Sequence, residues 1–213
     1  LHAGRWGGYH YQITGKDGLS TVTLEGGQQN NRPSKMHETY RFVENIFEEL
    51  DTFQEWYLDV EKARLYYMPA KGINPNQLKF VAPQLENLIY LSGSSFSPVH
   101  DIEVSGLRFM YTAPTFMKTS EPLLRSDWTI YRQGAVKIEG AENCIFRAND
   151  FIALGGNAIF VNNYNRRVKI EGNRIEQIGA GAINFVGDPA AVRSPEFRYE
   201  KFVPFDQMDT IEG

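Results

Sequence analysis

A repeat of about 24 residues runs through the second half of the chain and constrains its fold more than any other feature. Short segments that alternate apolar and polar residues align without gaps: NLIYLSG (87–93), GAVKIEG (134–140), NAIFVNN (157–163) and GAINFVG (181–187). A second series runs in step: HDIEVSGLRF (100–109), ENCIFRANDF (142–151) and RRVKIEGNRI (166–175). The recurring neighbour of each strand is its own copy one period on, so the strands pair in parallel and their coils stack. The repeat predicts an all-β fold, a right-handed parallel β-helix (a solenoid) with about 24 residues per coil.

The same period places polar residues over one another in successive coils. Three pairs meet in this way: Arg147 over Glu171, Asp150 over Arg174, and Asn149 over Asn173. Opposite charges across paired strands stabilise by roughly 0.2–1 kcal/mol each, so we expect both charged pairs to form ion pairs. Stacked asparagine amides can hydrogen-bond along the axis of the stack.

The first eighty residues lack the repeat and predict a β-rich subdomain (1–80), packed on or inserted in the β-helix coils (81–213). EWYLDVEKARLYYMPAKG (55–72) predicts two aromatic-rich strands around a polar turn. ETYRFVENIFEELD (38–51) predicts a short helix, because its apolar residues fall on one helical face. We expect the coils to be incomplete at the C-terminal end.

Composition and charge exclude several classes of partner. The net charge of −4 gives no reason to expect nucleic acid or an anionic membrane surface. No apolar run approaches the roughly 18 residues of a membrane-spanning helix. The single cysteine, Cys144, rules out an internal disulfide and a cysteine-based zinc site, and the four histidines lack metal-ligand spacing. We expect a monomer without a metal or cofactor.

Four longer strings carry a resemblance to a known family: VENIFEELDTFQEWYLD (43–59), LYYMP (65–69), EPLLRSDWTIYRQGAV (121–136) and GGNAIFVNNYNRRV (155–168). They resemble the pectate-lyase-like right-handed β-helix proteins of bacterial polysaccharide degradation, and in particular relatives of glycoside hydrolase family 141. The resemblance implies a secreted or periplasmic carbohydrate-active protein of several hundred residues. Because the chain starts at Leu1 without a Met, we expect it to be a piece of that protein, with the catalytic acidic residues largely beyond Gly213.

An excursion at 114–133 holds the first group of candidate substrate-binding residues. The starts of the first three segments of the first series lie 47 and then 23 residues apart, so one coil is about double the usual length. Long excursions in solenoids tend to build binding clefts on one face. Its candidates are Arg125, Asp127, Trp128 and Tyr131. In the alternative interpretation, Trp128 packs the excursion onto the coil and Arg125 pairs with Asp127.

Further candidates lie at two corners of the repeat. In the loop NNYNRR (162–167), Asn162, Tyr164 and Asn165 suit sugar hydroxyls and the apolar face of a pyranose, although such amides also satisfy turn backbones. Asp188 opens a second excursion and is a weak catalytic candidate, since an Asp there also suits an Asx-turn. We interpret Glu139 as an ordinary exposed strand charge.

Three functions remain open from the sequence. The first is a glycoside hydrolase acting on a polysaccharide through two carboxylates, one the general acid and the other the nucleophile or base. The second is a carbohydrate-binding or surface β-helix protein without catalysis. The third is a calcium-dependent polysaccharide lyase, for which Arg125 or Arg167 could abstract a proton, although no acidic cluster stands beside either.

Overall fold

The computed structural model describes residues 8–27, 36–118, 121–122, 129–188, 204 and 206. The fold of this part is all-β, as the sequence predicts, and the helices it contains are single 3-10 turns such as η1 (Phe47–Glu49) and η2 (Pro75–Gln77). None of the helices in these ranges is long and apolar enough to cross a bilayer.

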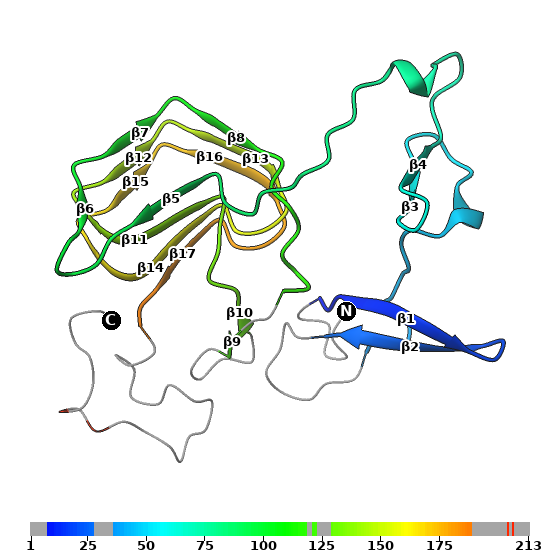
Figure 1. Cartoon of the computed structure of the whole chain (residues 1–213), viewed down its shortest axis with the longest axis horizontal. Helices are drawn as coiled ribbons and strands as arrows, with labels where there is room; N and C mark the ends of the chain where they lie inside the picture. The colour runs from blue at the N-terminus through cyan, green and yellow to red at the C-terminus, as the bar shows by residue number, and fades with distance from the viewer. Residues whose placement is uncertain are drawn as a thin grey trace.

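Three parallel sheets form the larger part of the structure (Figure 1). The first runs in the order β5 (Ile89–Ser92), β11 (Val136–Glu142), β14 (Ile159–Arg166) and β17 (Ile183–Val186), and β6 (Val99–His100) pairs with the second half of β11. The second holds β7 (Glu103–Ser105), β12 (Ile145–Arg147) and β15 (Lys169–Glu171). The third holds β8 (Arg108–Met110), β13 (Asp150–Leu154) and β16 (Arg174–Ile178). The chain passes through the three sheets in turn, so each strand pairs with its repeat in the next pass.

The pairing register is the one that the repeat predicts. In the first sheet Ile89 pairs with Val136, which pairs with Ile159, which pairs with Ile183. In the second, Val104, Phe146 and Ile170 superpose, and in the third Phe109, Phe151 and Ile175 do the same. The sequence alignment of the repeats is therefore confirmed residue by residue.

Left-handed residues turn the chain at matching corners of successive passes. Their φ angles lie between 51° and 69°, in the left-handed region that residues other than glycine seldom adopt. Two corners repeat: Asp101, Asn143 and Arg167; and Gly106, Ala148 and Gly172. A third matching left-handed position follows β8 at Tyr111 and lies inside β13 and β16 at Ala153 and Gln177. One such residue per corner lets the strands stay short and change direction at the same place in each pass.

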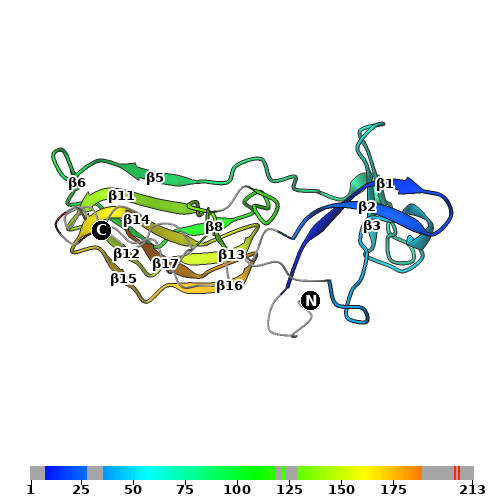
Figure 2. The same ribbon diagram turned by 90° about the horizontal axis from the view of Figure 1, so that it is seen from below.

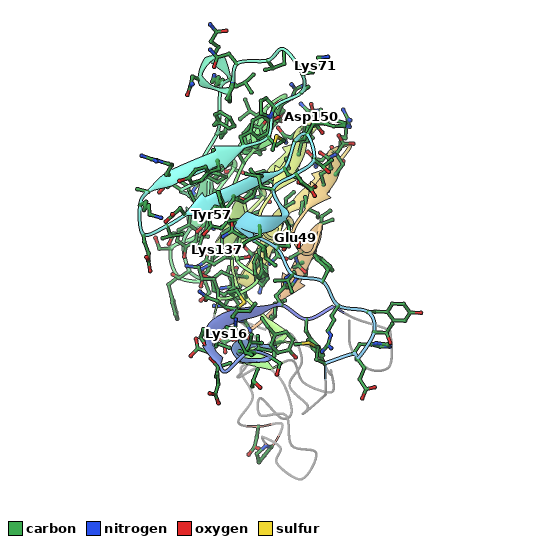
Figure 3. The ribbon with its side chains drawn as sticks, turned by 90° about the vertical axis from the view of Figure 1, so that its right-hand side faces the viewer. Lys16, Glu49, Tyr57, Lys71, Lys137 and Asp150 are labelled. Carbon is green, nitrogen blue, oxygen red and sulfur yellow. The ribbon has the colours of Figure 1, made fainter. Side chains whose placement is uncertain are left out.

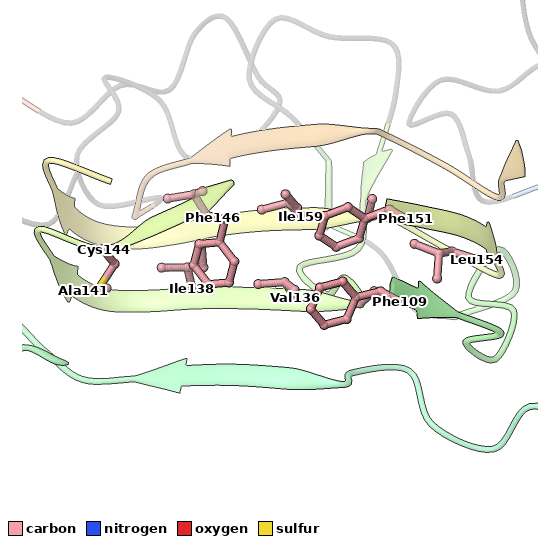
Figure 4. Packing of buried hydrophobic residues seen from close by; sticks show 12 residues of the cluster. Phe109, Val136, Ile138, Ala141, Cys144, Phe146, Phe151, Leu154 and Ile159 are labelled. Carbon is pink, nitrogen blue, oxygen red and sulfur yellow. The ribbon is translucent and has the colours of Figure 1, made fainter. Parts of the chain in front are cut away.

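Inward-facing side chains of the three sheets form one apolar core (Figure 4). Its centre is the middle pass, where Val136, Ile138 and Phe146 are 0% exposed. The rings of Phe109 and Phe151 stack one pass apart, with centroids 4.7 Å apart. Cys144 lies in this core as a free, buried thiol, as expected of a small apolar residue.

The charged pairs lie in the predicted register, but the ion pairs form with other partners. Arg147 pairs in register with Glu171, yet its Nη2 lies 2.7 Å from an oxygen of Glu103 in the preceding pass. The prediction of these ion pairs was wrong because Arg147, Asp150 and Arg174 each have another opposite charge at a closer or diagonal position. Asp150 likewise contacts Arg108 at 3.3 Å, and Arg174 contacts Glu176 at 2.5 Å.

The asparagine stack forms as predicted. Asn149 is 1% exposed, and its Nδ2 donates to Asn173 Oδ1 at 3.0 Å and to the Val104 carbonyl at 3.0 Å. Its Oδ1 accepts from the Leu107 N–H at 3.0 Å. Asn173 Nδ2 donates in turn to the Phe146 carbonyl at 2.9 Å. These amides supply hydrogen-bond partners to backbone N–H and carbonyl groups at a corner, where strand pairing does not.

The N-terminal part holds two antiparallel hairpins, which lie to one side of the sheets (Figures 1 and 2). They are β1 (Tyr11–Asp17) with β2 (Thr21–Gly26), and β3 (Trp56–Asp59) with β4 (Arg64–Tyr67). The second hairpin confirms the strands predicted within 55–72. The view in Figure 3 has its Tyr57 in front, and this ring packs edge-on against Phe47 at 5.3 Å. The domain boundary near residue 80 stays a prediction.

The helix predicted within 38–51 does not form, and that prediction was wrong. Only η1 is helical there, and Asn45 has a left-handed φ of 59°. The Asn45 amide instead accepts from the Leu58 N–H at 2.9 Å and donates to the Leu58 carbonyl at 3.3 Å. This side chain ties the segment to β3, and Phe42, on the expected apolar face, is 84% exposed. A short amphipathic helix depends on packing of its whole apolar face, and here Phe42 and Val43 of that face stay exposed.

Candidate functional site

The outer face of the first sheet carries a polar cluster beside the excursion. Alternation along each strand buries Ile138 and turns Lys137 and Glu139 outward. The register brings Tyr90, from β5, beside Lys137 and brings Asn162, from β14, beside Glu139. We call this group the outer-face cluster: Tyr90, Arg132, Lys137, Glu139, Asn162 and Asn163.

Glu139 is the carboxylate at the centre of the cluster. Its Oε2 accepts from Tyr90 Oη at 3.0 Å and lies 3.0 Å from Lys137 Nζ, and its Oε1 accepts from Asn163 Nδ2 at 2.9 Å. Burial alone would raise the pKa of Glu139, but hydrogen bonds from Lys137, Asn162 and Tyr90 outweigh it and lower the pKa. The side chain is 23% exposed, so our interpretation of an ordinary exposed charge was incomplete.

Tyr90 provides an aromatic surface next to this carboxylate. Tyr90 is 50% exposed, and Lys137 Nζ lies 4.7 Å from the centroid of its ring. The cation lies over one face of the ring and holds it in place through a cation–π contact. A partly exposed ring beside fixed polar groups can contact the apolar face of a sugar while those groups bind its hydroxyls.

Arg132 joins the excursion to the sheet. Its Nε donates to Glu121 Oε1 at 2.7 Å, on β9 (Glu121–Pro122), which pairs with β10 (Thr129–Ile130). Its Nη1 donates to Asn162 Oδ1 at 2.7 Å and to Asn163 Oδ1 at 3.2 Å. Because Asn163 also bonds Glu139, a continuous chain of hydrogen bonds runs from the excursion to the central carboxylate.

Tyr131, a predicted substrate-binding residue, fixes the base of the excursion. Its hydroxyl donates to Glu86 Oε2 at 2.8 Å, and Lys118 Nζ lies 2.9 Å from Glu86 Oε1. Burial, followed by the hydrogen bond to Glu86, raises the pKa of Tyr131 to about 12. The same hydrogen bonds, from Lys118 first and then Tyr131, lower the pKa of Glu86.

The NNYNRR segment, predicted as a loop, lies on β14 at the irregularity in its pairing with β11, and its predicted binding residues bond within the protein. Asn165 Oδ1 accepts from the Ala141 N–H at 3.0 Å, and its Nδ2 donates to the Asn162 carbonyl at 2.7 Å. Tyr164, 6% exposed, donates its hydroxyl to Glu142, which raises the pKa of the phenol and lowers that of the carboxyl. These contacts agree with the turn-forming alternative, and a role in sugar binding stays a prediction.

The other candidates lie elsewhere. Arg125, Asp127 and Trp128 fall outside the described residues. Asp188 is partly buried directly after β17. Among the predicted residues that the structure describes, Asn162 is a member of the outer-face cluster, and Asn165 contacts it through the hydrogen bond to the Asn162 carbonyl.

Five members of the cluster were missed as site residues: Tyr90, Arg132, Lys137, Glu139 and Asn163. The repeat alignment contains the signal that could have found three of them, because it places Tyr90 beside Lys137 and Glu139 beside Asn162. The contacts of Arg132 depend on the path of the excursion, which no alignment of repeats describes.

Within the described ranges, no group of three or more His, Cys, Asp or Glu residues could hold a metal ion. Compared with known proteins, the chain matches no family model, no curated protein and no solved structure. The functional argument therefore depends on the geometry of the outer-face cluster.

Proposed function

We propose that the chain forms coils of a right-handed parallel β-helix from a secreted, polysaccharide-degrading glycoside hydrolase, and that the outer-face cluster contacts the saccharide. The observation that carries this proposal is Glu139, a carboxylate whose pKa is lowered by surrounding donors beside a half-exposed tyrosine ring. The parallel sheets and the 24-residue register support the β-helix.

A carboxylate held ionised suits a nucleophile or a general base. The general acid of a glycosidase needs the opposite, a pKa raised so that it keeps its proton. We therefore assign Glu139 the nucleophile or base role and expect the acid on another residue. Lys137 and Asn163 would orient the carboxylate, and Tyr90 would contact the sugar ring.

The row of residues across the first sheet that contains Glu139 favours a second candidate function, binding of a saccharide without its cleavage. Glu139 pairs with Ser92 on one side and with Asn162 on the other, and Asn162 pairs with Val186. No second carboxylate therefore lies in this row among the described strands. Two catalytic carboxyl groups stand about 5–5.5 Å or roughly 6.5–9.5 Å apart. If the protein has no general acid within that reach, the cluster binds a saccharide but does not cleave it.

A panel of neutral and acidic polysaccharides, incubated with the protein, separates these functions. New reducing ends without unsaturated uronate would support the hydrolase, and ultraviolet absorbance from unsaturated uronate would identify a lyase. Binding in affinity electrophoresis without products would support the second candidate. Failure of every polysaccharide to bind would contradict the proposal.

Variants then test the residues. For a hydrolase, Glu139→Gln should retain saccharide binding and lower the rate about 10²–10⁴-fold, as for loss of a catalytic base. Tyr90→Ala should weaken binding several-fold. Glu103→Gln is the matched control, because it removes a 41%-exposed carboxylate from another sheet. Equal loss in the control and in Glu139→Gln would exclude the assigned role.

The earlier candidates have their own test. We expect Trp128→Ala and Asp188→Asn to weaken oligosaccharide binding while the far-ultraviolet circular dichroism stays unchanged. If Trp128→Ala unfolds the protein with no separable effect on binding, Trp128 is a packing residue.

A further inference from the structure

Two consecutive asparagines of β14 reach the same side of the first sheet. In a regular strand, neighbouring side chains point to opposite faces, so Asn162 and Asn163 would not both meet one partner. Here the pairing of β14 with β11 is irregular directly after Glu139, and Asn163 has a left-handed φ of 54°. Such an irregularity changes the direction of a side chain. Both amide oxygens therefore accept from Nη1 of one guanidinium, that of Arg132, at 2.7 and 3.2 Å.

This guanidinium determines which way round each amide lies. An arginine side chain carries donors and no acceptor, whereas an asparagine amide has an oxygen that accepts and a nitrogen that donates. An amide that meets Arg132 must therefore present its oxygen, and its nitrogen is left for another acceptor. In Asn163 this nitrogen donates to Glu139 Oε1 at 2.9 Å, and Asn162, which pairs with Glu139 in the register, also hydrogen-bonds to the carboxylate. A flipped amide would present its oxygen to the carboxylate, where no hydrogen lies between the two oxygens.

Arg132 is itself held by groups on both sides. Its Nε donates to Glu121 Oε1 on β9 at 2.7 Å, and its Nη1 also donates to the Val186 carbonyl on β17 at 3.4 Å. The side chain of Arg132 is 18% exposed, so little water competes for its hydrogens. The ion pair and the backbone contact therefore keep its donors in one geometry toward the two asparagines.

We propose that Arg132 is a positioning residue that fixes both asparagine amides with their nitrogens toward Glu139, and thereby orients this carboxylate and stabilises its charge. The inference rests on the proposed function for its consequence on a saccharide, but its effect on Glu139 is measurable without one. The excursion thus acts on the carboxylate through Arg132, which lies two hydrogen bonds away from it.

Glu139 has other titratable neighbours, and they contact its second oxygen. Lys137, on the same strand, lies 3.0 Å from Glu139 Oε2, and Tyr90, on β5, donates to the same oxygen at 3.0 Å. Asn163 bonds Oε1 instead. A substitution of Arg132 therefore changes the groups at Oε1 and leaves the contacts of Lys137 and Tyr90 in place.

Titration of Glu139, followed by nuclear magnetic resonance, tests this inference. Glutamate labelled with carbon-13 in its carboxyl group gives one signal per residue, and Glu139→Gln identifies the signal of Glu139. In Arg132→Gln the new side chain can accept as well as donate, so it no longer determines the orientation of the amides. We expect the pKa of Glu139 to rise toward the ordinary value of a glutamate in Arg132→Gln. It should stay low in Arg132→Lys, because a lysine again carries donors and no acceptor.

A double-substitution cycle separates positioning from the direct charge of Arg132. The direct charge would change the pKa of Glu139 equally with and without Asn163, whereas positioning needs the amide. Adding Arg132→Gln to Asn163→Ala should therefore shift the titration less than Arg132→Gln does alone. Arg147→Gln is the matched control, since it removes a 52%-exposed guanidinium from another sheet and should leave the titration unchanged.

The outcomes for the inference and for the proposed function are distinct. An unchanged pKa of Glu139 in Arg132→Gln, or equal shifts with and without Asn163, would overturn the inference even in a protein that cleaves a saccharide. A shifted titration in a protein that binds no saccharide would contradict the proposed function alone. For a hydrolase, the acidic limb of the activity profile should move to higher pH in Arg132→Gln. Circular dichroism establishes that each variant is folded, and Arg132→Met, which also lacks the donors, replaces Arg132→Gln if the latter unfolds.

Discussion

At the scale of single residues, the polar groups around the first sheet are held by short networks. Asn163 shows this most clearly, because its amide accepts from Arg132 at 3.2 Å and donates to Glu139 at 2.9 Å. One side chain thereby couples the excursion to the central carboxylate. Removing any member leaves a polar group without its partner, which costs more than the lost bond.

Tyr131 gives a residue-scale prediction with a defined pH range. Its pKa is raised to about 12 in the folded protein, whereas tyrosine in an unfolded chain titrates near 10. The contribution of the neutral phenol is therefore fully present below about pH 10 and is lost as the pH rises toward 12. We expect Tyr131→Phe to lower the free energy of unfolding by about 1.5–3 kcal/mol at pH 8, because it removes a bond to a charged group.

Urea unfolding from pH 8 to 12 measures this effect. The difference between wild type and Tyr131→Phe should be constant up to about pH 10 and then shrink. Tyr40→Phe, at a 48%-exposed tyrosine of the N-terminal part, is the control variant. A difference that does not change with pH would show that the Tyr131 hydroxyl does not act through its proton.

At the scale of elements, the corners between strands decide where each pass turns. The corner formed by Gly106, Ala148 and Gly172 uses glycine in two passes and alanine in one. Ala148 has a φ of 51°, which costs an L-residue roughly 1–2 kcal/mol relative to the right-handed conformation. Glycine carries no such cost, although it loses about 0.5–1 kcal/mol more chain entropy on folding.

We therefore predict that Ala148→Gly raises the free energy of unfolding by about 0.5–1 kcal/mol, the difference between these two terms. Thermal and urea unfolding measure the change. Ala70→Gly is the control, because Ala70 is exposed and is not among the residues with positive φ, and this substitution should be neutral or destabilising. Equal effects of the two substitutions would mean that the corner is not strained.

At the scale of the whole molecule, stability is concentrated in the middle pass. Phe146 is 0% exposed there, whereas Phe185 on β17, the last described strand of the first sheet, is 65% exposed. We predict that Phe146→Ala lowers the free energy of unfolding by about 3–5 kcal/mol, the usual cost of a large cavity. Phe185→Ala should lower it by less than about 1 kcal/mol, because little of its surface leaves water on folding.

Both variants are compared by urea unfolding. A cost for Phe185→Ala that approaches that of Phe146→Ala would show that Phe185 is covered in solution. The ratio of the two costs therefore reports how the core is distributed along the stack.

The sequence by itself determined the strands, their parallel pairing and their register. Two physical periods produce this result: the alternation of side chains along a strand and the 24-residue spacing that brings each strand back to its copy. The Asn149 and Asn173 stack follows from the same spacing, because a corner amide has few partners other than its copy.

Only the tertiary structure decided which side chains meet across segments without the repeat. Arg147 forms its ion pair with Glu103 and not with Glu171, and residues 38–51 form no α-helix because Asn45 bonds β3. The outer-face cluster depends on the excursion that brings Arg132 to Asn162, a contact between residues 30 apart in the sequence. The period of the repeat determines which residues are neighbours in successive passes. Long side chains reach several possible partners, and irregular loops follow paths that the repeat does not describe, so their contacts depend on the tertiary structure.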